Sequence, residues 1–144
     1  MLLVTHVLTG AVIGQKISDP IVLTLLALGS HFLLDWIPHW SYNVPKTNSL
    51  REFVKLLPDI LPSILIYVVF IFSYPDQWVL ITLGVTMAIL PDFITLTRHS
   101  KNLSKIFEKI NYWHGRIQVH DEKILGLVSQ VIYVALLIII LYSV

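Results

Sequence analysis

The chain has 144 residues, of which 56% are hydrophobic and only 13% are charged. This length suits a single domain, but a soluble domain usually carries about a quarter charged residues. We therefore expect an integral membrane protein with membrane lipid as its surroundings. The formal net charge of +1 gives no reason to expect a nucleic acid partner. Without cysteine, the chain can form neither disulfides nor thiolate metal sites.

Long apolar segments separated by turns predict an all-α fold, a polytopic membrane helix bundle in one domain covering 1–144. The first segment has no basic stretch before it and is interpreted as a retained helix, not a signal peptide. It is shorter than the ~20 residues that a membrane span needs, so the sequence leaves open whether it spans. We expect about five membrane helices, at about 2–15, 20–37, 58–73, 78–96 and 124–143, and an amphipathic interfacial helix at about 101–119.

The distribution of basic residues predicts an orientation in the membrane. Loop 39–55 and segment 98–123 together hold nine of the ten Lys and Arg residues, and Lys16 is the tenth. Cytoplasmic loops carry an excess of these residues. We therefore expect the N-terminus and both basic segments in the cytoplasm, with the C-terminus outside.

Histidines and carboxylates interrupt the apolar segments at one predicted depth. His31 and Asp35 lie one turn apart on the same helix face, and Asp92 lies near the cytoplasmic end of the fourth helix. An ionisable group in a membrane span costs roughly 2.5–3.5 kcal/mol and usually faces a partner or a cavity. Several such groups at one level predict a divalent cation, zinc or manganese first of all. The predicted metal ligands are His6, His31, Asp35 and Asp92.

Other roles stay open for some of these polar residues. Asp35 could instead pair with Arg98. Asp59 suits the first turn of a helix because an acidic side chain there interacts favourably with the helix dipole. The sequence does not decide whether Asp59, His39 and His99 take part in the site.

Four short motifs carry a resemblance to a known family: Thr5-His6…Gly10, Ser30-His31-Phe32-Leu33-Leu34-Asp35, Leu90-Pro91-Asp92 and His114-Gly115-Arg116…His120. They are similar to elements of the bacterial and archaeal inner-membrane metal-dependent hydrolase family. The element that ends in Asp35 comes second in this chain and last in that family. The resemblance implies a metal-dependent hydrolase in a prokaryotic inner membrane.

The leading hypothesis is a hydrolase that acts on a phosphoester or ester near the cytoplasmic headgroup level, with a lipid as one candidate substrate. A bound metal would lower the pKa of a water molecule, and His114 or His120 would donate a proton to the leaving group. The alternatives are a non-enzymatic membrane protein, such as an accessory subunit of a larger complex, and a small transporter or proton relay. The sequence also leaves open a homo-oligomer.

Overall fold

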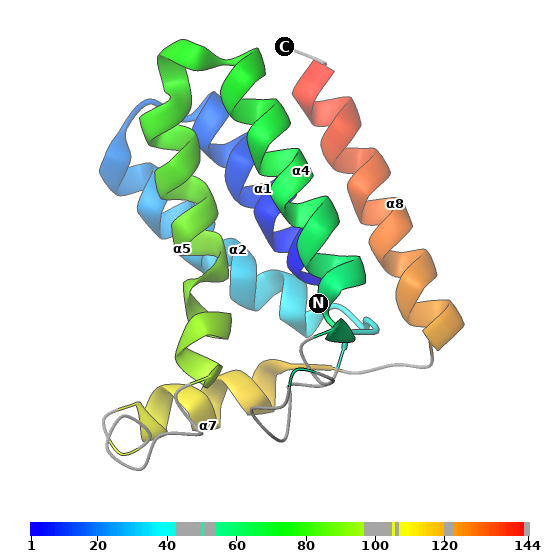
Figure 1. The fold of residues 1–144 in the computed structure, drawn as a ribbon. Helices are drawn as coiled ribbons and strands as arrows, with labels where there is room; N and C mark the ends of the chain where they lie inside the picture. The colour runs from blue at the N-terminus through cyan, green and yellow to red at the C-terminus, as the bar shows by residue number, and fades with distance from the viewer. Residues whose placement is uncertain (43–49, 51–53, 97–104, 106, 120–122, 143–144) are drawn as a thin grey trace.

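The computed structural model describes residues 1–42, 50, 54–96, 105, 107–119 and 123–142, and it is helical, as predicted (Figure 1). A short 3₁₀ helix, η1 (Pro75–Gln77), leads directly into α5. The six α-helices of the described residues are α1 (Leu3–Lys16), α2 (Pro20–Trp36), α4 (Leu57–Ser73), α5 (Trp78–Leu96), α7 (Glu108–Ile117) and α8 (Lys123–Tyr142).

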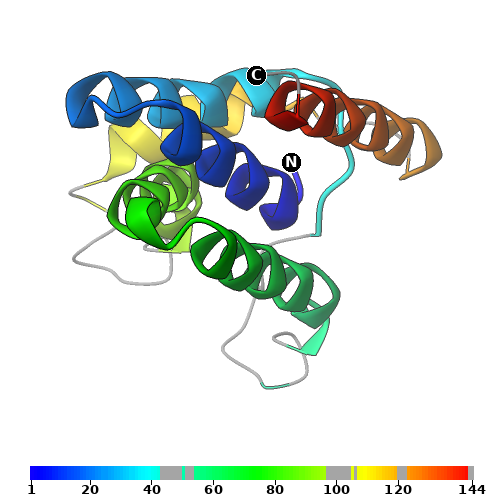
Figure 2. The same cartoon turned by 90° about the horizontal axis from the view of Figure 1, so that it is seen from above.

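Helix α1 is the centre of the bundle. It contacts α2, α4, α5 and α8, and these four helices surround it when the molecule is viewed from above (Figure 2). Nine of its 14 residues are buried, including a continuous run from Thr5 to Val12. A helix that is apolar on all sides belongs in the interior. The hydrophobic core therefore forms around α1, from Val7, Leu8, Ala11, Val12, Phe70, Ile81, Val85 and Leu137.

Glycines allow α1 and α5 to pack with their backbones in contact. A Cβ atom at Gly10 would lie 2.5 Å from the carbonyl oxygen of Gly84, and one at Gly14 would lie 2.5 Å from that of Leu80. A Cβ at Gly84 would lie 2.3 Å from the carbonyl oxygen of Gly10. Small residues four apart permit this kind of close approach between helices. The stripe formed by Gly10 and Gly14 thus has a packing role.

The ends of α2 follow from local chemistry. The Asp19 side chain accepts hydrogen bonds from the backbone N–H groups of Ile21 and Val22, both at 2.9 Å, and so caps the helix. At the other end Ile37 is extended because it precedes Pro38. His39 therefore lies just beyond the helix, as the sequence predicts, and its backbone N–H donates to the carbonyl of Val119 at 3.1 Å.

The prediction of about five membrane helices is wrong. Among the described residues only two helical segments, Pro75–Thr95 and Lys123–Tyr142, are long and apolar enough to cross a membrane. Helices α2 and α4 have 17 residues each and α1 has 14, whereas a span needs ~20. Apolar character alone suggested five spans. In α1, however, the apolar side chains are buried against the other helices. The predicted interfacial helix at 101–119 lies partly outside the described residues, and α7 covers ten of its positions.

We expect Gly84→Ala to destabilise the protein because its methyl group would meet the α1 backbone, which has little room to move. Overpacking of this kind costs about 1–3 kcal/mol, and thermal unfolding of the purified protein in detergent would measure it. Gly29→Ala is the matched control, since a Cβ there has no atom within 4 Å. In a helix that substitution should be neutral or stabilise by about 0.5–1 kcal/mol. Equal unfolding midpoints for the two variants would contradict the packing described here.

Candidate metal centre

Polar side chains converge at the end of the bundle where α1 begins, and α7 lies across this end (Figure 1). The Asp35 carboxylate, in the last turn of α2, is at the centre of the group and is completely buried. Each of its two oxygens faces a different set of partners. A buried charge of this kind must be compensated by opposite charge or by hydrogen-bond donors.

The Oδ2 atom of Asp35 faces two histidines and an amide. The Nε2 atoms of His114 and His31 lie 3.0 Å and 3.3 Å from it. Gln118 donates a hydrogen bond to the same oxygen from its side-chain nitrogen at 3.2 Å. His31 reaches Asp35 along the face of α2 that their four-residue spacing predicts. His114 comes from α7, a segment 79 residues further along the chain.

The remaining contacts of the histidine rings indicate where their protons lie. The Nδ1 atom of His31 lies 2.6 Å from the carbonyl oxygen of Ala88, which can only accept. This ring is neutral when Nδ1 carries its proton, and its Nε2 then presents a lone pair. The Nδ1 atom of His114 lies 3.3 Å from Thr95 Oγ1, whose single proton is donated to the Pro91 carbonyl at the shorter distance of 2.9 Å. Thr95 therefore accepts from His114, and the second Nε2 also presents a lone pair.

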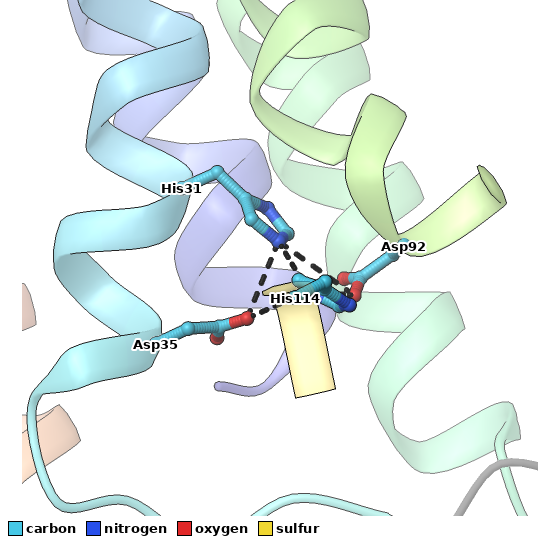
Figure 3. Close-up of side chains that lie close together, drawn as sticks. All are labelled: His31, Asp35, Asp92 and His114. Carbon is cyan, nitrogen blue, oxygen red and sulfur yellow. Dashed lines mark hydrogen bonds and ion pairs between the residues drawn. The ribbon is translucent and has the colours of Figure 1, made fainter. Parts of the chain in front are cut away.

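Asp92 completes a group that could hold a metal ion. Its Oδ1 atom lies 3.8 Å from His31 Nε2 and 3.7 Å from His114 Nε2, and its side chain is 33% exposed. Each of the four residues His31, Asp35, Asp92 and His114 offers one ligand atom, and these four atoms all lie within 4.8 Å of one another (Figure 3). Two ligands of a tetrahedral zinc ion with bonds of ~2.0–2.1 Å are about 3.3 Å apart. The His31, His114 and Asp35 atoms are separated by 3.0–3.3 Å, close to that spacing.

The Oδ1 atom of Asp35 faces a second set of groups. His6 Nε2 lies 3.3 Å from it and His39 Nε2 lies 4.0 Å from it. The ammonium group of Met1 donates a hydrogen bond to the same oxygen. The His6 ring stacks on the His31 ring, with centroids 4.2 Å apart. His6 is therefore next to the four-residue group, on the opposite side of the Asp35 carboxylate from His114.

His6 and Asp35 lie outside the two candidate membrane spans, and their surroundings set their charge. Burial lowers the pKa of His6 from 6.5 to about 4, although Asp35 acts in the opposite direction. Burial alone would raise the pKa of Asp35. The net effect of the neighbouring hydrogen-bond donors, with the Met1 ammonium among them, outweighs burial and holds the pKa of this carboxyl well below its usual range. At neutral pH an uncharged imidazole therefore faces an ionised carboxylate, the forms in which both bind metals.

The predicted residues thus take different places. The structure brings His31, Asp35 and Asp92 together, and it adds His114, for which the sequence suggested a proton-donating role. His6 approaches Asp35 separately. His120, His99 and Arg98 lie outside the described residues.

Sequence reasoning missed two supporting side chains of the group. Gln118 follows His114 by four residues and Thr95 follows Asp92 by three. On a helix these spacings place Gln118 on the same face as His114, and Thr95 on the same face as Asp92. This signal could have identified both side chains.

Asp59 does not contact this group but fixes the start of α1. Its carboxylate, in the first turn of α4, accepts hydrogen bonds from the backbone N–H groups of Leu3 at 2.8 Å and Val4 at 3.0 Å. These are two of the four N–H groups that the first turn of a helix leaves without a partner. Asp59 thereby holds in place the helix turn that carries His6.

No family model matches the chain, and neither does a curated protein or a solved structure. A function must therefore be inferred from the residues and contacts of this chain itself.

Asp59→Ala should lower the free energy of unfolding by about 1–2 kcal/mol, the usual cost of losing a helix cap. Asp59→Asn keeps one acceptor oxygen and should lose less. Thermal unfolding in detergent would measure both variants. Asp76→Ala is the control, because Asp76 is an exposed acid in the first turn of η1. If all three variants unfold at the temperature of the unmodified protein, Asp59 does not anchor α1.

Proposed function

We propose that this protein binds a divalent cation, zinc or manganese, between His31, Asp35, Asp92 and His114 and hydrolyses a phosphoester or ester at the membrane surface. One observation carries the proposal. The lone pair of His31 Nε2 lies 3.0–3.8 Å from three other atoms that can accept a proton or bind a cation. These are the Nε2 atom of His114 and one carboxylate oxygen each of Asp35 and Asp92.

A cation satisfies this arrangement better than a proton does. A proton on His114 Nε2 could point at His31 or at Asp35, but it would leave the other contact and both contacts to Asp92 without a donor. The group contains two carboxylates, and the Met1 ammonium compensates only that of Asp35, at Oδ1. A divalent cation at the centre of the group would neutralise the remaining charge and bind the three close atoms of His31, Asp35 and His114. Mixed nitrogen and oxygen ligands suit zinc and manganese.

The surface of the helices supports a membrane location. Large apolar side chains cover the outer faces of the bundle, and in α8 they extend along most of its length. Such a surface is too large for a water-facing monomer but suits contact with lipid tails. The most exposed of these residues include Ile21, Leu25, Leu61, Leu65, Phe72, Val79, Ile124, Val131 and Ile139.

Helix α7 suggests the depth of the group in the membrane. It exposes Tyr112 and Trp113, and the Arg116 guanidinium lies 5.6 Å from the centre of the Tyr112 ring. Aromatic residues collect at the headgroup level of a bilayer, and basic residues there bind anionic headgroups. Because α7 also supplies His114, we place the group at this level, on the cytoplasmic side where the basic segments are expected. A phosphoester of a lipid headgroup is the substrate that such a depth favours.

The four side chains divide into three close ligands and one outer group. Catalytic zinc sites commonly have three protein ligands and one open position, where the bound metal acidifies a water molecule and polarises the substrate. His31, Asp35 and His114 are the three close ligands, and all are buried. Asp92 is further away and partly exposed, so it can accept a proton from water and pass it to solvent. In this division His114 binds the metal, and Asp92 is the residue that transfers the proton.

Elemental analysis of the protein purified in detergent should find at least one zinc or manganese ion per chain. His31→Ala and His114→Ala should each reduce the metal content because each removes one of the three close ligands. Asp76→Asn, a change in an exposed carboxylate, should leave it unchanged. If the unmodified protein holds no metal after supplementation with either ion, the group is a hydrogen-bonded helix-packing network, as in an accessory subunit.

Asp92→Asn should retain the metal but lower kcat by about 10²–10⁴-fold, the usual contribution of a general base, with a smaller effect on KM. Suitable substrates are a chromogenic phosphodiester, a chromogenic carboxylic ester and a fluorogenic phospholipid in mixed micelles. A metal-loaded protein that hydrolyses none of them would overturn the hydrolase proposal and leave the metal site standing. Unchanged kcat in the variant would remove Asp92 from the mechanism.

A further inference from the structure

We infer that the Asp35 carboxylate bridges two divalent cations, with the second bound at Oδ1 by His6 and His39. This inference rests on the proposed function, since it takes the cation at Oδ2 as the first of the pair. Asp35 is the residue that both groups share. Its Oδ2 atom contacts His31 and His114, while its Oδ1 atom faces His6 and His39.

His6 provides the first argument for a second cation. Its side chain is completely buried, and neither of its ring nitrogens has a hydrogen-bond partner among the described residues. A buried polar group without a partner costs about 1–3 kcal/mol, and native structures contain few such groups. Its Nε2 lies 3.3 Å from Asp35 Oδ1, the spacing of about 3.3 Å expected for two ligands of one tetrahedral zinc ion. A cation between these two atoms would give His6 Nε2 a partner.

The stacking of His6 on His31 would allow each histidine to bind one of two neighbouring cations. The two ring planes differ by only 21° and their centroids are 4.2 Å apart. Each ring directs Nε2 at the Asp35 carboxylate, His6 towards Oδ1 and His31 towards Oδ2. Cations that share a catalytic centre are typically about 3.5–4 Å apart. The centroids of the stacked rings are slightly further apart than this, at 4.2 Å.

His39 provides the second argument, because its ring is oriented as a metal ligand. Its Nδ1 lies 2.8 Å from the carbonyl oxygen of Ile37, so this nitrogen donates, and Nε2 is the nitrogen that faces Asp35. Metal-binding histidines usually have this kind of backbone partner, and His31 has the same arrangement with Ala88. The backbone of His39 is held by the Val119 carbonyl. Its Nε2 is 4.0 Å from Asp35 Oδ1, so a cation could lie between them.

A cation at Oδ1 would have to displace the Met1 ammonium from this oxygen. The Met1 ammonium already places a positive charge against this oxygen, which shows that the buried carboxylate is compensated from this side as well. Each oxygen of a carboxylate has two lone pairs, so one oxygen can bind each metal. A divalent cation at Oδ1 would take over the compensation that the ammonium supplies.

Metal stoichiometry measured on Mn²⁺-loaded full-length protein in detergent tests the inference, with electron paramagnetic resonance as a second readout. The unmodified protein should hold two Mn²⁺ per chain with the spectrum of a magnetically coupled pair. His6→Ala and His39→Ala should each hold one ion and show an uncoupled signal. Asp35→Ala should lose both ions because it removes the shared ligand.

His6→Gln tests the same site if the alanine variant does not fold, because glutamine keeps a polar side chain of similar reach. This variant should also lose one ion. Leu8→Ala is the matched control, because it opens a cavity in the same buried helix but should still hold two coupled ions.

The possible results separate this inference from the proposed function. One ion per chain in the unmodified protein and in both histidine variants would overturn the second cation and leave the first in place. No ion in a folded His6→Ala and His6→Gln would assign His6 to the first cation, which also overturns the inference. No ion in the unmodified protein would overturn both.

Discussion

The structure depends on the charge of one buried carboxylate. Asp35 is completely enclosed at the end of α2, and an isolated carboxylate there would cost several kcal/mol. The residue before α1, the segment after α2 and the last turn of α7 each supply a group within 4.0 Å of it, Met1, His39 and His114. The three segments are thus brought together by electrostatic compensation, and the same carboxylate belongs to a group that could hold a metal ion.

Precise positioning of the histidines depends on contacts that lie outside the group. Backbone carbonyls fix the rings of His31 and His39, and a threonine hydroxyl fixes that of His114. These contacts orient each Nε2 towards Asp35. For His6 the corresponding constraint is the helix itself, which Asp59 caps from α4. Ligand orientation is therefore set by the packing of the bundle.

Close packing of α1 against α5 connects the fold to the proposed chemistry. Because Gly10, Gly14 and Gly84 have no side chains, the two helices meet backbone to backbone. This packing places the helix that carries His6 beside the one that carries Asp92. Helix α7 then covers the end of both with His114, and its exposed aromatic residues suggest contact with lipid headgroups. A site built in this way combines three buried polar side chains with one partly exposed carboxylate.

The sequence by itself determined the helical character of the chain, the capped start and proline-limited end of α2, and the alignment of His31 with Asp35. These features depend on residues within one or two helical turns, where spacing and backbone chemistry decide the outcome. Only the tertiary structure decided that α1 is enclosed, that His114 lies beside His31, Asp35 and Asp92 and that Asp35 divides its oxygens between two sets of histidines. Hydrophobic periodicity shows that a helix has an apolar surface but does not distinguish lipid from a neighbouring helix, which is why five spans were expected where two helices are long enough. The contacts of His114 with His31 and Asp35 join residues 83 and 79 positions apart, and no local spacing predicts which distant helix will supply a ligand.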